Sequence, residues 1–253
     1  MDINNYIYGR NSVFEALNSQ TNRINKVLIS QNVSKDAKIN EIIKLAKEKK
    51  VIFQFVPKEK FKEFENLPHQ GIAAYVSPVK YHDIDDFLSK KPDKRYKKLI
   101  ILDGVEDPHN FGAIARTALC AGFDGIIIPS RRNAQVNATV EKTSAGAINH
   151  IPVMQVNSLS GTITKLKDND YWIIAADAKG KDNYFDVDFT DMNLALIMGG
   201  EETGVSKGNL KQSDFVVKIP MLRNFNSLNV SNAATAIIYE IVRQNIKKHG
   251  LEI

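Results

Sequence analysis

The stretch LIILDGVEDPHNFGAIARTALCAGFDGIIIP, residues 99–129, contains the pattern on which the fold of this chain depends. It begins with an apolar run, continues through a polar turn into a segment with helical spacing of apolar residues, and ends on a second apolar run at residues 125–129. Short apolar runs bounded by turn residues are typical of strands that are buried on both faces of a sheet. A strand–helix–strand order is typical of parallel pairing, so the stretch predicts a β-α-β unit.

The same alternation continues toward the C-terminus. Further strands are expected at four places, residues 151–156, 171–178, 194–200 and 214–220. A long final helix is expected over residues 228–250, with Lys247 and Lys248 in its last turn and Gly250 as its C-terminal cap. We therefore expect an α/β domain over residues 99–253, built on a parallel sheet covered by helices.

A smaller unit precedes this domain. Strand-like and helix-like segments alternate in the order β-α-β-α-β over residues 26–30, 36–50, 51–56, 58–67 and 71–79. This order predicts a compact α/β domain over residues 1–80. Residues 81–98 are expected to form a basic linker, because their last part, KKPDKRYKK, combines six basic residues and a proline with no apolar periodicity.

The excess of positive charge lies in the N-terminal part of the chain. The formal net charge is +5 overall, and it divides into +7 on residues 1–98 and −2 on residues 99–253. A basic surface attracts polyanions such as nucleic acids. The alternative is that these lysines are ordinary solvating charges, and composition alone leaves both interpretations open.

The composition excludes several classes of protein. A hydrophobic content of 43% with 25% charged residues is typical of a soluble globular protein. No apolar run approaches the ~20 residues that span a bilayer, and residues 1–17 lack the pattern of a signal peptide. Cys120 is the single cysteine and cannot form an internal disulfide, which favours a cytoplasmic protein. The five histidines are scattered without metal-ligand spacing, so no metal site is expected.

The start of the helix within residues 99–129 carries polar side chains that burial does not require. Asp107 and Pro108 suit an N-cap and a first helical turn. Arg116 lies among small apolar residues, so a wholly exposed position is not expected for it, and Gly112 would leave space beside its guanidinium group. An arginine in such a pocket suits a phosphate or planar anion. An ion-paired side chain on the flank of the helix is the structural alternative.

Two further candidate segments follow later strands, where the ligands of a parallel sheet bind. Gly199, Gly200 and Glu201 follow one strand, and their glycines would allow backbone to approach a ligand, although a tight turn needs the same residues. The polar cluster 224–232 contains Ser227 and Asn229 before the final helix; its polar side chains exceed what one cap requires. No G-x-G-x-x-G or G-x-x-x-x-G-K-[ST] motif is present, so dinucleotide and P-loop binding lose their main support.

Three segments in this order resemble the motifs of the SpoU family of RNA 2′-O-ribose methyltransferases, in the SPOUT superfamily. They are D-x-x-x-D-P-x-N-x-G-x-x-x-R-T (Asp103 to Thr117), I-M-G-G-E-x-x-G (Ile197 to Gly204), and I-P-M followed by S-L-N-V-S-x-A (Ile219 to Ala233). SAGA, residues 144–147, is similar to the family's S-x-G-A segment. The N-terminal IYGRNSVFEAL and HQGIAA resemble the ribosomal-protein-L30e-like RNA-binding domain of the branch that contains the bacterial 23S rRNA guanosine 2′-O-methyltransferase.

The resemblance implies a fold, a cofactor and partners. It implies a deep trefoil knot at the end of the catalytic domain, S-adenosylmethionine as the cofactor, a homodimer formed through that domain, and RNA, here 23S rRNA, as the substrate. The positions carried over as catalytic are Arg116, Asn110, Glu201, Ser227 and Asn229. The positions carried over as cofactor-binding are Gly199, Gly200, Glu201, Ile219, Met221, Leu228 and Val230.

The expected roles follow from the chemistry of methyl transfer to a hydroxyl. Arg116 holds the family's position for proton removal, but a guanidinium group stays charged and is a poor base. We therefore expect Arg116 to bind the adjacent phosphate and to lower the cost of losing the proton, with Asn110 orienting Arg116 or the ribose. Ser227 and Asn229 would shape the site.

One position departs from the pattern of the branch. Arg223 lies two residues after I-P-M, where that branch usually has glycine, so the cofactor pocket or its RNA side could differ here. Three alternatives remain: a tRNA 2′-O-methyltransferase, a catalytically inactive RNA-binding paralogue, and a nucleotide-dependent oxidoreductase. The missing dinucleotide fingerprint disfavours the last of these.

Overall fold

The computed structural model describes residues 6–19, 23–34, 36–65, 67–90, 96–223 and 227–250. Backbone contacts divide the chain into two compact units. The first unit comprises residues 1–81 together with residues 135–138, and the second comprises residues 82–134 and 139–253.

The first unit is a four-stranded mixed sheet with helices on both faces. Its strands, in the spatial order β1-β4-β2-β3, are Tyr6–Tyr8, Ile72–Val76, Ile24–Ser30 and Phe53–Val56. Strand β3 runs parallel to β2, whereas β4 is antiparallel to β2 and β1. Helices α1 (Arg10–Ser19) and α2 (Ala37–Glu48) pack into one apolar cluster with the sheet. A separate cluster contains η3 (Lys58–Phe64), which is a 3-10 helix in place of the longer helix expected over residues 58–67.

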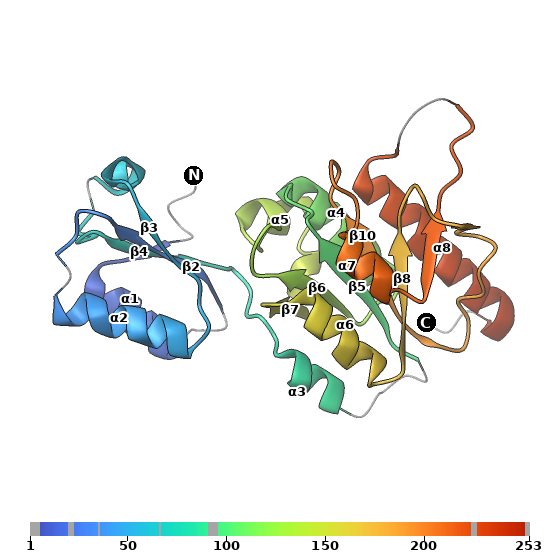
Figure 1. Ribbon diagram of the computed structural model, residues 1–253, viewed down its shortest axis with the longest axis horizontal. Coiled ribbons are helices and arrows are strands. Elements are labelled where there is room, and N and C mark those ends of the chain that lie inside the picture. Colours follow the sequence, from blue (N-terminus) through green and yellow to red (C-terminus); the bar gives the residue numbers. More distant parts are fainter. Residues whose placement is uncertain are drawn as a thin grey trace. The chain divides into compact units, whose positions relative to one another are not determined.

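The second unit contains a seven-stranded sheet in which every described pairing is parallel (Figure 1). The spatial order is β7-β6-β5-β10-β8-β11-β9. The strands are Val153–Val156, Gly125–Pro129, Lys98–Asp103, Asn193–Gly199, Tyr171–Ala176, Phe215–Lys218 and Asp182–Asn183, in that order. The prediction of a parallel sheet in an α/β domain is confirmed, and the two-residue strand β9 was not anticipated because it is too short to show an apolar pattern.

Helices cover both faces of this sheet. Helices α3 (Ile84–Ser89), α6 (Leu159–Lys167) and α7 (Lys207–Gln212) contribute to an apolar cluster with alternate residues of the strands, such as Leu99 and Ile101 of β5. Helices α4 (Pro108–Cys120) and α8 (Val230–His249) pack against each other and contribute nothing to that cluster. Because successive strand residues point to opposite faces, we assign α4 and α8 to the other face. Two short helices, α5 (Ala138–Thr143) and η4 (Ala147–Asn149), follow β6.

The order of the strands places a switch point between β5 and β10. The connection that leaves β5 leads through α4 to β6 on one side, and the connection that leaves β10 leads through α7 to β11 on the other side. The carboxyl ends of the two strands are adjacent, since Asp103 pairs with Gly199. In open parallel sheets, ligands bind beyond the strand ends at such a point.

A short helix, α3, lies within the residues that were expected to form a linker. Within residues 81–98, Ile84 and Phe87 of helix α3 are buried, while residues 91–95 of the expected linker lie outside the described residues. The trefoil knot implied by the resemblance stays a prediction. None of the helices in the described ranges combines the length and apolar character needed to cross a membrane.

Candidate active site

The first turn of α4 is built as the sequence predicts. Asp107 is the N-cap, its side chain accepts a hydrogen bond of 2.8 Å from the backbone N–H of His109, and Pro108 opens the helix. Asn110 follows in the same turn and is 7% exposed. A buried amide must be hydrogen-bonded to be tolerated, so its partners define what this turn faces.

Asn110 belongs to a network of three side chains from separate segments. Its Nδ2 donates to Glu201 Oε1 at 2.8 Å, and its Oδ1 accepts from Asn229 Nδ2 at 3.0 Å. Asn229 Nδ2 also donates to Glu201 Oε1, at 2.9 Å. Three of the five residues expected to be catalytic therefore lie together, and the carboxylate of Glu201 is held by two amides.

Asn229 has a second task at the start of α8. Its Oδ1 accepts hydrogen bonds from the backbone N–H groups of Ser231 and Asn232, at 2.9 and 3.4 Å, so it is the N-cap of that helix. The amide oxygen of Asn229 thus caps the helix, while its amide nitrogen donates to Asn110 and Glu201. The predicted cap is present, and the same side chain also joins the network with Asn110 and Glu201.

The segment after β10 folds back tightly on the strand. The N–H of Gly204 donates to the carbonyl of Gly200 at 2.9 Å, and the N–H of Gly200 donates to the carbonyl of Asp103 at 3.0 Å. A Cβ added to Gly199 would lie 2.1 Å from the carbonyl carbon of Gly204, and one added to Gly200 would lie 2.3 Å from the carbonyl oxygen of Gly104. Both glycines are therefore required by backbone packing, before any ligand is considered.

Asp103, at the end of β5, fixes the far end of this segment. Its Oδ2 accepts from the backbone N–H of Ser206 and from Nδ2 of Asn209, both at 2.8 Å. The carboxylate thereby holds the start of α7 next to the switch point. The segment from Gly199 to Ser206 is tied at both of its ends.

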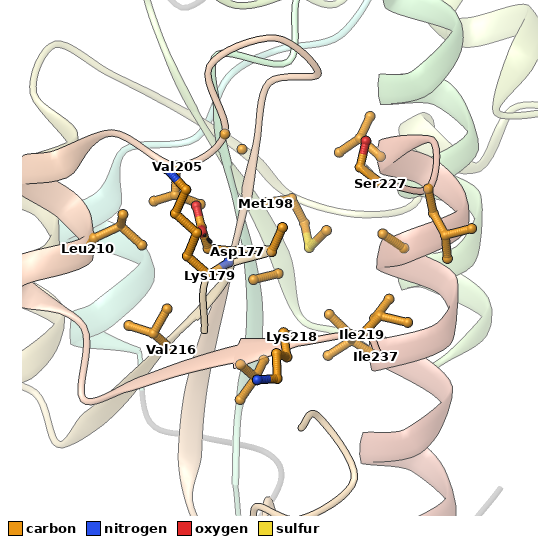
Figure 2. A pocket seen from close by; sticks show the side chains of 18 of the residues that line it. Asp177, Lys179, Met198, Val205, Leu210, Val216, Lys218, Ile219, Ser227 and Ile237 are labelled. Carbon is orange, nitrogen blue, oxygen red and sulfur yellow. Dashed lines mark hydrogen bonds between the residues drawn. The ribbon is translucent and has the colours of Figure 1, made fainter. Parts of the chain in front are cut away.

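A cavity of about 1100 Å³ opens beside this segment. Its lining includes all seven positions expected to bind the cofactor: Gly199, Gly200, Glu201, Ile219, Met221, Leu228 and Val230. Figure 2 shows Met198, Ile219 and Ile237 toward one side of the cavity and Asp177, Lys179 and Val205 toward the other. The lining of the cavity therefore combines apolar and charged side chains.

Sequence reasoning missed the charged residues of the cavity lining other than Glu201. Asp177 and Lys179 follow β8, Asp182 lies in β9, and Lys218 ends β11. The signal was available, because Asp177 comes directly after an apolar run and the carboxyl ends of parallel strands meet at one edge of the sheet.

Arg116 does not join the network. Its side chain is exposed, it is absent from the cavity lining, and among the described residues it has no hydrogen bond or ion pair. The exposed guanidinium group differs from the partly enclosed one that was expected, and no hydrogen bond joins Arg116 to Asn110 among the described residues. The other role expected for Asn110, orienting the ribose, stays a prediction. Six positions at about 100° each place the two side chains on different faces of α4.

Gly112 also has a different role from the expected one. A Cβ at this position would lie 1.9 Å from Oγ1 of Thr143 and 2.9 Å from the backbone N of Ser144. The Thr143 hydroxyl is fixed by a 2.7 Å hydrogen bond to the carbonyl of Thr139. The absence of a side chain at Gly112 therefore allows Thr143 and Ser144, at the start of the SAGA segment, to pack closely against α4. The space beside Gly112 is filled by these residues and is not available to Arg116.

The remaining candidates lie in the segment before α8. Ser227 is exposed and lines the cavity, and Arg223 is exposed without lining it. Residues 224–226, which belong to the predicted polar cluster, lie outside the described residues. Across the described ranges, no cluster of His, Cys, Asp and Glu could hold a metal ion.

Comparison with known proteins finds matches along most of the chain. A family model described as the SpoU rRNA Methylase family matches residues 97–239, and one described as RNA 2'-O ribose methyltransferase substrate binding matches residues 6–82. A Staphylococcus epidermidis protein named for the TrmH family of tRNA/rRNA methyltransferases is 47% identical over 247 residues, which cover 97% of each chain. A Staphylococcus aureus protein of the same name is 45% identical over 246 residues, again 97% of each chain.

Two solved structures extend the comparison to three dimensions. The TrmH/SpoU tRNA modifying enzyme of A. aeolicus has a TM-score of 0.56 and 28% identity, covering 64% of this chain and 80% of that one. The SpoU methyltransferase AviRb of Streptomyces viridochromogenes, crystallised in complex with AdoMet, has a TM-score of 0.60 and 24% identity. The alignment with AviRb covers 96% of this chain and 90% of that one, and it shows a shared fold.

Proposed function

Since this chain belongs to the SpoU family of RNA methylases, we propose that it transfers a methyl group from S-adenosylmethionine to a ribose 2′-hydroxyl, at a guanosine of 23S rRNA. The observation that carries this proposal is the network of Asn110, Glu201 and Asn229 beside the cavity of about 1100 Å³. Two amides that donate to one carboxylate hold all three side chains in fixed positions. Fixed polar groups of this kind can orient a reacting hydroxyl group.

The residues of the cavity fit the proposed cofactor. Its apolar residues, among them Met198, Ile219 and Ile237, suit a flat adenine ring, and the carboxylate of Asp177 suits a cationic sulfonium or ammonium group. Lys179 and Lys218 offer partners for the carboxylate of an amino acid. Gly199 and Gly200 also line the cavity.

The chain's own residues then have to align the hydroxyl and ease the loss of its proton. S-adenosylmethionine supplies an electrophilic methyl group: the ribose oxygen takes it, the C–S electrons remain on sulfur, and the hydroxyl proton leaves. We assign phosphate binding beside the target ribose to Arg116, because its exposed guanidinium has no partner among the described residues. Asn110, Glu201, Ser227 and Asn229 would position the ribose.

We assign RNA holding to an L30e-like domain over residues 1–80, joined by residues 81–98 to a catalytic domain over residues 99–253. The first unit has a polar hollow of about 640 Å³, whose lining includes Arg10, Lys58 and His69. The ring of His69 stacks on Phe61 with centroids 4.9 Å apart, and its Nδ1 accepts from the N–H of Gly71. Cationic side chains can bind the phosphates of a nucleic acid, and aromatic rings can stack on its bases. A binding surface separate from the catalytic domain suits a target nucleotide within a large folded rRNA.

We further propose that the catalytic domain forms a homodimer in the cytoplasm. Leu222, Leu228 and Tyr239 support a dimer, because they are exposed apolar side chains at and before α8, with 94%, 44% and 48% exposure. The single cysteine fits a reducing compartment. Sedimentation of the purified protein tests the dimer directly.

Mapping of 2′-O-methyl groups in rRNA and tRNA from a deletion strain and its parent tests the substrate. Loss of one guanosine methyl group from 23S rRNA supports the proposal, and a loss confined to tRNA identifies the tRNA alternative.

Calorimetry with S-adenosylmethionine tests the alternative of a catalytically inactive paralogue, which would bind RNA but not this cofactor. Among variants, Arg116→Ala should lower turnover while Arg243→Ala, an exposed arginine paired with Glu240, should not. Normal turnover and RNA affinity in Arg116→Ala would make both assigned roles wrong.

A further inference from the structure

The turn after β6 lies at the same edge of the sheet as the candidate active site. Two hydrogen bonds tie it to the segment after β5. Oδ1 of Asn133 accepts from the backbone N–H of Val105, and the N–H of Ala134 donates to the carbonyl of Val105, both at 2.8 Å. The backbone on both sides of this connection is thus held in place, and the conformation of the turn between Ser130 and Ala134 is fixed.

Arg132 occupies a strained position in this turn. Its φ is 54°, in the left-handed region that glycine and asparagine adopt most readily. Five other described non-glycine residues share this conformation. Three of them lie shortly after the ends of helices α2, α5 and α6, where it is usual, and they are Lys50, Ala145 and Asp170. The other two, Gln70 and Asp191, do not follow a helix and are not cationic. The turn at Arg132 has no such helix, so a long cationic side chain is kept where glycine would relieve the backbone. Strain that persists at a site edge points to a functional use of the side chain.

The backbone of Arg132 lies near the network of Asn110, Glu201 and Asn229. Its carbonyl oxygen lies 3.8 Å from the point where Gly104 would carry a Cβ, and the backbone N of Gly200 lies 3.9 Å from that point. The next residue along the chain is Glu201, whose carboxylate holds Asn110 and Asn229. Arg132 itself is exposed, and it has no hydrogen bond or ion pair with any described residue.

We propose that the guanidinium group of Arg132 binds an RNA phosphate near the target ribose. This inference rests on the proposed function, because it needs RNA at the edge of the second unit. The planar fork of a guanidinium group suits a phosphate, and such contacts set the register of a nucleic acid on a protein. Residues 99–253 carry a net charge of −2, so a contact of this kind has to come from an individually placed cation.

The substitution Arg132→Gly tests this with a built-in check on folding. Glycine removes the guanidinium group and relieves the left-handed backbone, so the thermal midpoint should stay the same or rise. The dissociation constant for a 23S rRNA fragment should rise about three- to tenfold. The slope of log K against log salt should fall by about 0.7 to 0.9, the value for one lost phosphate contact. The affinity for S-adenosylmethionine should not change.

Arg131→Ala is the matched control, because it removes the same charge from the neighbouring exposed residue. Unchanged RNA affinity and salt slope in Arg132→Gly overturn the inference, and so does an equal loss in Arg131→Ala, which would indicate a diffuse charge effect. The two proposals can fail separately. A wild-type protein that binds RNA but transfers no methyl group overturns the proposed function, and the binding comparison still tests Arg132. A wild-type protein that methylates RNA, with Arg132→Gly binding as well as wild type, overturns the inference alone.

Discussion

Gly112 is the residue at which the smallest change should have the clearest structural effect. It lies where α4 meets the end of α5, and a methyl group there would overlap the fixed hydroxyl of Thr143. Accommodation requires either a shift of the SAGA segment or a displacement of the helix, because the nearest atoms include backbone. Overpacking of this kind typically costs about 1 to 3 kcal/mol.

We therefore expect Gly112→Ala to lower the free energy of unfolding by that amount, measured by urea denaturation. The matched control is Gly208→Ala in helix α7, where an added Cβ meets nothing within 4 Å. That substitution should raise the stability by about 0.4 to 1 kcal/mol, since alanine restricts the unfolded chain. Equal stability of the two variants would contradict the packing described for Gly112.

Asn229 allows the two tasks of one side chain to be separated. Aspartate keeps an oxygen for the helix cap but has no N–H to give to Asn110 and Glu201, and it places two carboxylates side by side. Asn229→Asp should therefore keep α8 intact while methyl transfer falls at least about tenfold, the effect of ~1.4 kcal/mol. Asn229→Ala loses both tasks and should also lose about 1 kcal/mol of stability. Activity of Asn229→Asp at the wild-type level would show that the network does not position substrate.

The site residues that the sequence predicted well are those whose role follows from strand ends. Asn110, Glu201 and Asn229 each follow a strand at the carboxyl edge, and the structure brings them together. Arg116 and Gly112 were placed wrongly because their surroundings depend on helix rotation and on Thr143, a partner 31 positions away. The sequence pattern of helix α4 alone contains no information on the rotation of the helix or on the residue that packs against it.

At the scale of elements, the connection from β10 to α7 is the part that forms the cavity rim. Asp103 holds it through Ser206 and Asn209, although the carboxylate itself does not line the cavity. We expect Asp103→Ala to act through positioning: the dissociation constant for S-adenosylmethionine should rise about tenfold, measured by calorimetry, as two charge-assisted hydrogen bonds are lost.

Asp124→Ala is the control for this prediction. Asp124 also accepts a 2.8 Å hydrogen bond from a backbone N–H, that of Lys98, but at the amino end of β5. It should lower stability without changing cofactor affinity. If both variants bind the cofactor as the wild type does, Asp103 has no positioning role.

Elements with a clear apolar period were predictable, and short ones were not. Strands β5, β6 and β10 lie within a residue or so of their expected bounds, because burial on both faces produces uninterrupted apolar runs. The antiparallel β4 looked like any other strand, since direction is set by pairing and not by composition. Helix α3 is six residues long, too short for its period to be recognised.

At the scale of the whole molecule, the first unit is not one continuous stretch of chain. Val136, fully buried, donates from its backbone N–H to the Tyr81 hydroxyl at 3.1 Å, and its carbonyl accepts from Asn25 at 3.4 Å. The Tyr81 hydroxyl in turn donates to Asn25 Oδ1 at 2.7 Å, and burial raises the pKa of Tyr81. No sequence pattern linked residue 136 to residues 25 and 81, because they lie 111 and 55 positions away along the chain.

We expect Tyr81→Phe to cost about 1 to 3 kcal/mol, because it removes the hydrogen bonds that the Tyr81 hydroxyl makes with the buried Val136 N–H and with Oδ1 of Asn25. Hydrogen exchange of the Val136 amide should become faster. Tyr239→Phe, which removes a hydroxyl from a 48% exposed ring, should change neither quantity. Unchanged protection of Val136 in Tyr81→Phe would contradict the hydrogen bond.

The composite first unit also bears on how chains of this kind can be recombined. A chimera in which residues 1–81 come from a relative would replace Asn25 and Tyr81, but it would keep residues 135–138 of this chain. The incoming domain would then meet a foreign four-residue segment inside its core. A workable chimera has to carry two inserts, and natural recombination at a single crossover near residue 82 is disfavoured for the same reason.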